Sequence, residues 1–319
     1  MRARFAKGRS QLLDKKSMRY LLKNLFIIGI MLCQHQLLFG QQLPLFHQNI
    51  EDLNPAFIPD SYHKYNLNNS IDLRYRMQWV DIKDAPRTMS GSFTNWNDDY
   101  NLLLGTEVIN DVTGPTQFTG VYGKVGYGVM LDRDWQLNFA LKGGVVQYRV
   151  KGDKLNFLES GDYANNNANK IYPDFSLGTM LYFKEKYYVG MAVPQVMGLN
   201  LDVEGENGDF KVKRVQHYYG VAGARFAMYD QTWLELSSEV RYLANVPIYF
   251  NGNLSLELQE MLWVTASMSS SKELRMGIGF FEGIGDSMLK AGYVFSHFFQ
   301  GYGPDYGSTH ELTVRISWY

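Results

Sequence analysis

Apolar and polar residues alternate along the chain after residue 68, in segments that recur about fourteen times. In the last segment, polar residues alternate with Leu312, Val314, Ile316 and Trp318. Strict alternation is typical of β-strands that are apolar on one face only. Repeated strands of roughly ten residues, rich in aromatic side chains, are typical of outer-membrane barrels. The pattern therefore predicts an all-β fold, an antiparallel transmembrane β-barrel of about 14 strands.

Turn signals divide the alternating part into fourteen candidate strands. These are residues 70–79, 87–96, 101–109, 118–131, 135–149, 173–183, 187–194, 214–228, 232–243, 247–258, 261–270, 273–281, 287–296 and 309–319. Tight connections mostly follow the even-numbered strands, and the long ones, such as 150–172 and 195–213, follow odd-numbered strands. Because barrels of this class have short periplasmic turns and longer outer loops, both termini are predicted in the periplasm.

The N-terminal region carries the features of a secretory signal peptide. Arg19 and Lys23 precede an apolar stretch over residues 25–32, and a polar break follows. The stretch is too short for a membrane-spanning helix. The predicted organisation is a leader over residues 1–40 with Met18 as an alternative start, a periplasmic N-terminal segment over 41–68 and a barrel over 69–319.

Cleavage near Gly40 would change the charge of the chain. It removes eight of the 31 basic residues and one of the 32 acidic residues, which leaves a net charge near −8. An acidic mature chain argues against nucleic acid as a partner. The only cysteine, Cys33, lies in the leader, so the mature chain has no disulfide, thiolate nucleophile or cysteine metal site.

Several short motifs follow one another between residues 46 and 319. They are Asn54-Pro55-Ala56, Arg74 to Trp79, Ala85 to Thr88, Asn110-Asp111 with Gly114-Pro115 and Tyr122, Pro173-Asp174-Phe175 with Gly178, Tyr188-Val189-Gly190, and His310-Glu311-Leu312. In this order the sequence resembles the PorP/SprF family of Bacteroidetes outer-membrane proteins. It departs from the family's Asn-Pro-Ala-x-x-Gly stretch at Pro59, where the family has glycine.

The resemblance implies a barrel of the type IX secretion and gliding machinery. Its expected partners are a secreted adhesin-like surface protein, bound through its C-terminal sorting domain, other secretion components and outer-membrane lipid. The expected location is the outer membrane of a Gram-negative bacterium. A solute channel or hydrophobic-ligand transporter is the alternative, because alternation alone fits either function.

Six charged residues on the polar strand faces are candidates for binding a partner polypeptide in the lumen. They are Arg74, Arg76, Glu235, Glu239, Arg241 and Arg315. The first and last strands become neighbours when a barrel closes, which brings Arg74, Arg76 and Arg315 together. The same charges can instead pair across strands inside a filled barrel. Aromatic candidates in the outer loops are Tyr163, Tyr172, Phe298 and Tyr302, which would anchor a partner or meet lipid headgroups.

No motif indicates catalysis. The five histidines after the leader lack the spacing of a metal site, and the glycines from 120 to 128 lack that of a phosphate loop. A lipid hydrolase would need a serine beside a base; Ser308 with His310, or Ser237 with His217, are candidate pairs without a supporting motif. We therefore expect no enzyme activity, no cofactor and no metal.

Overall fold

The computed structural model describes residues 50–151, 168–194, 196, 200–205, 208–213, 216–229, 231–299 and 307–319. The chain separates into two compact units, Met1–Gln41 and Gln42–Tyr319, and all described residues belong to the second.

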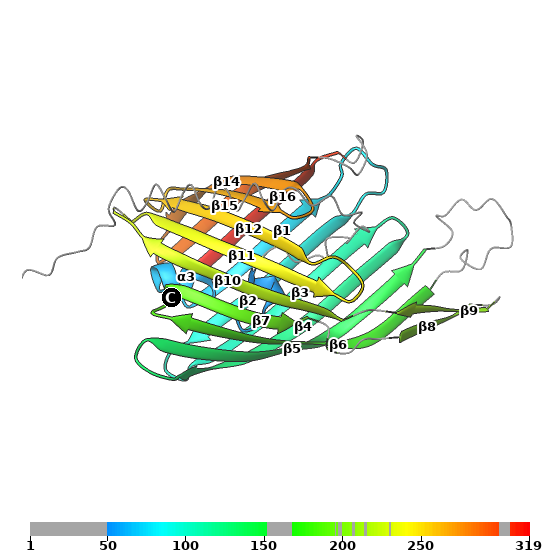
Figure 1. The fold of residues 1–319 in the computed structure, drawn as a ribbon, viewed down its shortest axis with the longest axis horizontal. Coiled ribbons are helices and arrows are strands. Elements are labelled where there is room, and N and C mark those ends of the chain that lie inside the picture. Colours follow the sequence, from blue (N-terminus) through cyan, green and yellow to red (C-terminus); the bar gives the residue numbers. More distant parts are fainter. Residues whose placement is uncertain are drawn as a thin grey trace, which may run out of the picture. The chain divides into compact units, whose positions relative to one another are not determined.

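Fourteen antiparallel strands form a closed barrel (Figure 1). They are β1 (Asn69–Met77), β2 (Arg87–Asn97), β3 (Leu102–Thr113), β4 (Thr116–Met130), β5 (Trp135–Val150), β6 (Ala168–Phe183), β7 (Tyr187–Val193), β10 (His217–Ala227), β11 (Trp233–Leu243), β12 (Tyr249–Leu258), β13 (Leu262–Ser269), β14 (Glu273–Ile284), β15 (Ser287–Phe298) and β16 (Thr309–Trp318). Each strand pairs with the barrel strands that precede and follow it, β7 pairs with β10, and β1 pairs with β16 to close the ring. The predicted fold class and strand number are confirmed.

Side chains alternate between the outer and inner faces of the wall. On β5, Phe139 and Leu141 are exposed, whereas Ala140 and Lys142 are buried inside. Because the barrel is closed, no strand lies at a sheet edge. The backbone N–H and C=O groups of every strand can therefore bond to neighbouring strands in a lipid environment. The strands therefore present apolar side chains to lipid, whereas the inner face carries both polar side chains such as Lys142 and apolar ones such as Ala140.

The connections differ at the two ends of the barrel. Turns such as 184–186 and 259–261 join strands at one end, where the chain also leaves β16. At the other end, the segment between β7 and β10 contains a separate two-stranded sheet, formed by β8 (Asn200–Gly205) and β9 (Gly208–Lys213). In barrels of this class the end with short turns faces the periplasm.

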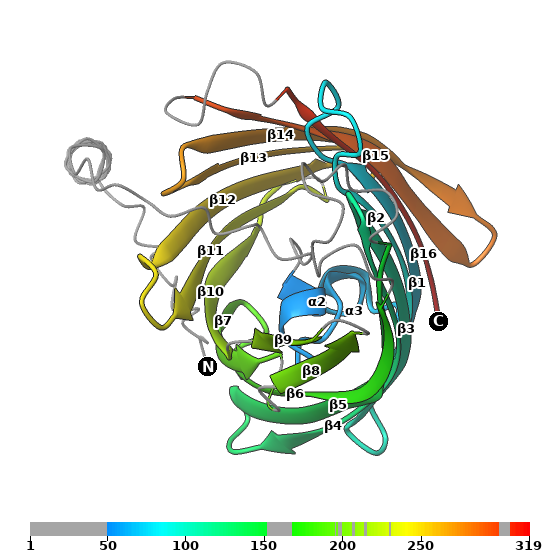
Figure 2. The same ribbon diagram turned by 90° about the vertical axis from the view of Figure 1, so that its right-hand side faces the viewer.

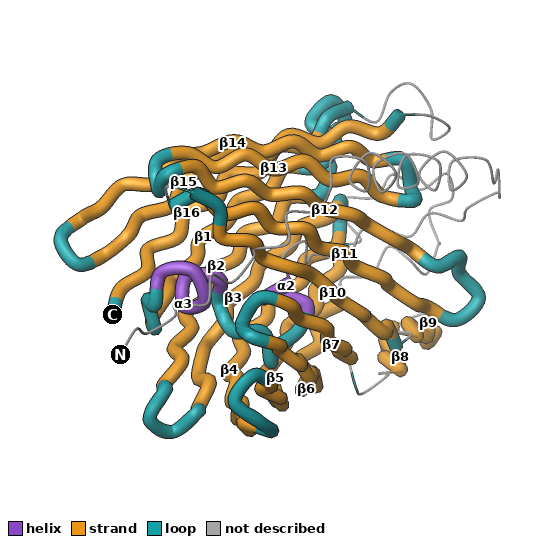
Figure 3. The backbone as a smooth tube through the Cα atoms, turned by 60° about the vertical axis from the view of Figure 1, so that its left-hand side comes forward, coloured by secondary structure: helices purple, strands orange, loops and turns teal. Residues whose placement is uncertain are grey.

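An N-terminal segment lies inside the barrel (Figures 2 and 3). It contains α2 (Ile50–Leu53) and α3 (Asp60–Tyr65), and we call residues 50–66 the plug. Its Ala56, Phe57 and Ile58 pack in one buried cluster with wall residues such as Trp96 and Met180. No described helix has the length and apolarity needed to cross a membrane. The sequence predicts a periplasmic segment over residues 41–68 before the barrel, whereas residues 50–66 of that range lie inside the ring of strands (Figure 2).

Candidate functional site

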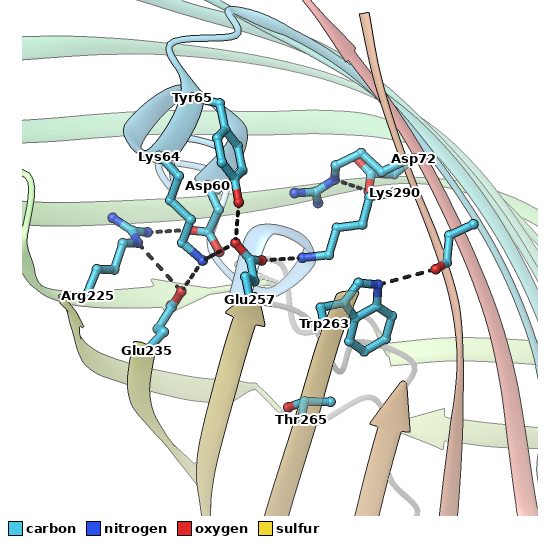
Figure 4. A network of polar contacts seen from close by, with 12 residues as sticks. Asp60, Lys64, Tyr65, Asp72, Arg225, Glu235, Glu257, Trp263, Thr265 and Lys290 are labelled. Atoms are coloured by element: carbon cyan, nitrogen blue, oxygen red, sulfur yellow. Dashed lines mark hydrogen bonds and ion pairs between the residues drawn. The ribbon is translucent and has the colours of Figure 1, made fainter. Parts of the chain in front are cut away.

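The plug is joined to the wall by a buried network of ion pairs around α3 (Figure 4). Lys64 Nζ lies 2.9 Å from Glu235 Oε2 on β11 and 3.4 Å from Glu257 Oε2 on β12. Arg225 on β10 forms an ion pair with Asp60, and Lys290 Nζ on β15 lies 2.6 Å from Glu257 Oε1. Two tyrosines donate to the same carboxylates, at 2.8 Å from Tyr65 to Glu257 and 2.7 Å from Tyr188 to Glu235. Three cations thus face three carboxylates.

Because these side chains are buried, the equal number of positive and negative charges is energetically important. The side chains of Lys64 and Arg225 are only 2% and 1% exposed. Burial disfavours both charged forms, but Asp60, Glu235 and Glu257 outweigh it and raise the pKa of Lys64 above its ordinary value. Burial likewise opposes ionisation of Asp60, yet Arg225 and Lys64 hold its pKa well below the ordinary value. Both plug residues are therefore charged at neutral pH.

His63 of α3 lies beside this network without joining it. Both ring nitrogens are sheltered from solvent and have no hydrogen-bond partner among the described residues. The ring packs against Tyr62 and Tyr182, with centroids 5.4 Å and 4.8 Å away. Burial, reinforced by the nearby Arg225, lowers the pKa of His63 well below its ordinary value, so the imidazole is neutral.

A second ion-pair cluster joins α2 to the seam of the barrel. Arg74 on β1 bonds Asp52 of the plug. Arg315 on β16 lies 2.7 Å from Glu51 of the plug and 2.5 Å from Asp72 on β1. Two guanidinium groups from the first and last strands are thus shared among three carboxylates, two of which belong to the plug.

The middle of the plug is fixed by hydrogen bonds rather than charge. Asn54 Nδ2 donates to the carbonyl oxygens of Thr179 at 3.0 Å and Met191 at 3.1 Å, on β6 and β7. A row of small inward residues lies in register under this segment, formed by Gly126, Ala140, Gly178 and Ala192. A Cβ on Gly178 would overlap Asn54 Oδ1 and lie 2.7 Å from Pro55 Cδ. The small residues therefore allow the plug backbone to approach the wall.

The plug fills the lumen unevenly. Its apolar side packs against a wall that includes β2, β3 and β5–β7. On the other side, a cavity of about 230 Å³ separates it from strands β11–β16 and β1. Many of the wall residues lining this cavity are small and polar: Ser237, Asn251, Asn253, Ser255, Thr265 and Ser267. The cavity can hold water or part of a second polar chain.

All six charged residues singled out from the sequence sit in the wall beside the lumen, where each has an ionic partner. Arg74, Glu235 and Arg315 contact the plug, as described above. Glu239 bonds Arg241, and Arg76 lies 4.0 Å from Glu273. The lumen is thus filled, as in the second alternative, but not all of these pairs cross strands, since Glu239 and Arg241 both lie on β11. A role of the six residues in binding a partner stays a prediction.

The aromatic candidates have different positions. Tyr172 lies within β6 and is buried in a cluster with Ile109, Tyr122 and Val146, so it is not a loop residue. Phe298 is the last residue of β15 and is half-buried. Tyr163 and Tyr302 lie outside the described residues.

Of the two serine–histidine pairs considered, one forms. Ser308 Oγ lies 2.8 Å from His310 Nε2, and Tyr293 bonds the other ring nitrogen. Both of these partners are hydroxyl groups, so neither is the carboxylate that orients the base in a catalytic triad. His217 pairs with Leu243 across β10 and β11, whereas Ser237 pairs with Gly223, so the second pair is separated. Among the described residues, no group of three or more His, Cys, Asp or Glu is placed to hold a metal ion.

Sequence reasoning missed the plug residues Asp60 and Lys64, their wall partners Arg225 and Glu257, and Lys290, which pairs with Glu257. The only sequence signals were the motif at Asn54 and the glycines at 178 and 190, which the structure shows to be two sides of one contact.

The chain resembles a known family in sequence and a solved barrel in fold. The model of a family described as "Type IX secretion system membrane protein PorP/SprF" matches residues 38–316. No curated protein matches the sequence. Among solved structures, the Pseudomonas putida toluene transporter TodX superposes with a TM-score of 0.50 at 8% identity, covering 83% of this chain and 92% of that one. A Pseudomonas aeruginosa FadL homologue gives 0.47 at 7% identity, covering 83% and 92%, and Acinetobacter baumannii Omp33 gives 0.41 at 8%, covering 79% and 97%. At such identity the TodX match concerns the fold alone.

Proposed function

Since this chain belongs to the PorP/SprF family of type IX secretion system membrane proteins, we propose that its barrel binds the C-terminal sorting domain of a secreted surface protein and supports its export or surface attachment. The family and the barrel fold indicate an outer-membrane protein. The sorting domain would be bound at the end of the barrel that carries the longer loops.

The observation that best supports this proposal is the occupied lumen. Lys64 and Asp60 are held in a balanced, buried network with wall residues, and Asn54 is bonded to two strands. Such contacts favour a barrel that presents a binding surface over one that conducts freely. No catalytic step is required of this function.

The test is native affinity purification of the tagged full chain from outer membranes, followed by mass spectrometry. We expect a large secreted protein to be retained, and to be lost when its C-terminal domain is deleted. An unrelated outer-membrane barrel with the same tag is the control for adhesion to the resin. Repeated recovery of the isolated barrel under gentle detergent would contradict the proposal.

The cavity of about 230 Å³ beside the plug favours one second candidate, a channel for small polar solutes. Its polar lining would keep water in the passage. Planar-bilayer recordings separate the two functions, because a channel conducts without any partner, whereas a partner-binding barrel stays closed.

A further inference from the structure

Arg74 and Arg315 form a pair of inward guanidinium groups at the seam of the barrel. They come from β1 and β16, which closure makes adjacent, with Asp72 directly opposite Arg315 in the register. Their side chains are only 11% and 13% exposed. Guanidinium groups of this kind match carboxylates in both charge and geometry.

The wall alone does not neutralise this pair. Of the three carboxylates bonded to it, Asp72 belongs to the wall, while Glu51 and Asp52 belong to the plug. Without α2, the two guanidinium groups would share one carboxylate. Two cations beside one carboxylate leave a net positive charge, so the vacated site would favour a new carboxylate.

The structure also provides a way to exchange the occupant. α2 is only four residues long, and Asn54 immediately after it is anchored separately to β6 and β7. The cavity of about 230 Å³ borders Glu51, Asp72, Arg74 and Arg315. A second chain in this cavity would lie beside the arginines, and the Asn54 hydrogen bonds hold the middle of the plug without any contribution from α2.

We propose that Arg74 and Arg315 form a carboxylate-binding site for an acidic peptide segment, and that Glu51 and Asp52 of the plug are its resident occupant. Assigning the acidic segment to the secreted partner rests on the proposed function, but the existence of the site does not. The plug acts at this site as an internal competitor, and a partner segment gains access by replacing its two carboxylates.

Fluorescence anisotropy on the purified full chain tests the site directly. The probes are a labelled peptide Ala-Glu-Asp-Ala and its neutral counterpart Ala-Gln-Asn-Ala. In the variant Glu51→Gln/Asp52→Asn, the resident carboxylates are gone, so we expect the acidic probe to bind about tenfold or more tightly than to the unmodified chain. The neutral probe should bind equally weakly to both. Adding Arg74→Gln/Arg315→Gln should abolish acidic-probe binding, whereas Lys184→Gln, which removes an exposed cation, should leave it unchanged.

Equal binding of the acidic and neutral probes to the Glu51→Gln/Asp52→Asn variant would overturn the inference, as would binding that persists without the two arginines. If the double variant does not fold, the single variant Glu51→Gln provides the same comparison, because Arg315 then loses its only plug carboxylate. The result is independent of partner recovery from membranes. A failed probe experiment with a recovered partner rejects the site and leaves the proposed function standing, and the reverse result rejects only the function.

Discussion

Gly178 on β6 leaves the space that Asn54 of the plug occupies, since a Cβ atom at position 178 would overlap the Asn54 side-chain oxygen. The two residues belong to motifs far apart in the sequence, yet they form one contact between plug and wall. The space at Gly178 is therefore a condition for docking of the plug.

Substituting Gly178→Val should displace the plug while the barrel still forms. An Ala56→Cys reporter in a Cys33→Ser background measures this, because Ala56 is fully buried and the chain has no other cysteine. We expect its labelling by a maleimide to accelerate more than about tenfold, as the buried reporter becomes exposed. Gly220→Ala on β10 is the matched control, because a Cβ there meets nothing within 4 Å. Unchanged labelling in Gly178→Val would contradict the contact.

Replacing Lys64→Met should destabilise the protein strongly. It leaves Glu235 and Glu257 without their shared cation inside the barrel. Removing one partner of a buried ion pair typically costs about 3–5 kcal/mol, which chemical unfolding followed by tryptophan fluorescence would measure. Lys184→Met is the control, because the Lys184–Asp134 pair is 57% and 49% exposed, and such pairs contribute about 0–1 kcal/mol. Similar losses in both variants would be inconsistent with the buried network.

Docking of the plug should weaken in mild acid because of His63. Burial and Arg225 lower its pKa in the docked plug, whereas an undocked His63 has an ordinary pKa near 6.5. The undocked state therefore binds more protons below pH 6.5. The equilibrium constant for docking then falls by at most about tenfold per pH unit, until the pH reaches the pKa of His63 in the docked plug. The Ala56→Cys labelling rate from pH 8 to 5.5, normalised to a denatured sample at each pH, measures this.

His63→Leu is the control for that pH dependence. Burial also raises the pKa of Glu51, so protonation of Glu51 favours the docked state and opposes the histidine effect at lower pH. Asp60 has a lowered pKa and remains charged throughout this range. If the unmodified chain and His63→Leu respond identically, the response does not come from His63.

A charge on the outer wall should be costly only in the middle of a strand. Leu141 is exposed near the centre of β5, whereas Gln147 lies nearer the end of the same strand. Leu141→Arg should lower the free energy of unfolding in lipid by about 2–4 kcal/mol, and Gln147→Arg by about 0–1 kcal/mol, which reversible unfolding from vesicles would measure. Equal costs at the two positions would contradict a place for the middle of β5 within the hydrocarbon core of the membrane.

The wall could be predicted from sequence because its signal is local. Each strand, such as β16 with Leu312, Val314 and Ile316, carries the alternation that defines its two faces. The turn residues then fix the strand order, since each strand pairs with its neighbours.

The plug could not be predicted in this way. Its helices are four and six residues long, too short for a clear period, and their stability comes from distant wall residues. The alternation places Arg74 and Glu235 on the polar strand face. Their pairing with Asp52 and Lys64 cannot be read from it, because it depends on how the chain folds back into the lumen. Only the three-dimensional arrangement shows that these charges are already paired.

The seam between β1 and β16 imposes an order on assembly. Asn69 and Trp318 pair across 249 positions, so the ring can close only after the last strand has been made. The plug precedes β1 in the sequence, and its Glu51 forms an ion pair with Arg315 on β16. A wall that curls around a segment already lying against β5–β7 avoids threading that segment through a finished ring. The N-terminal segment would then serve as an internal template whose carboxylates meet the last strand as it arrives.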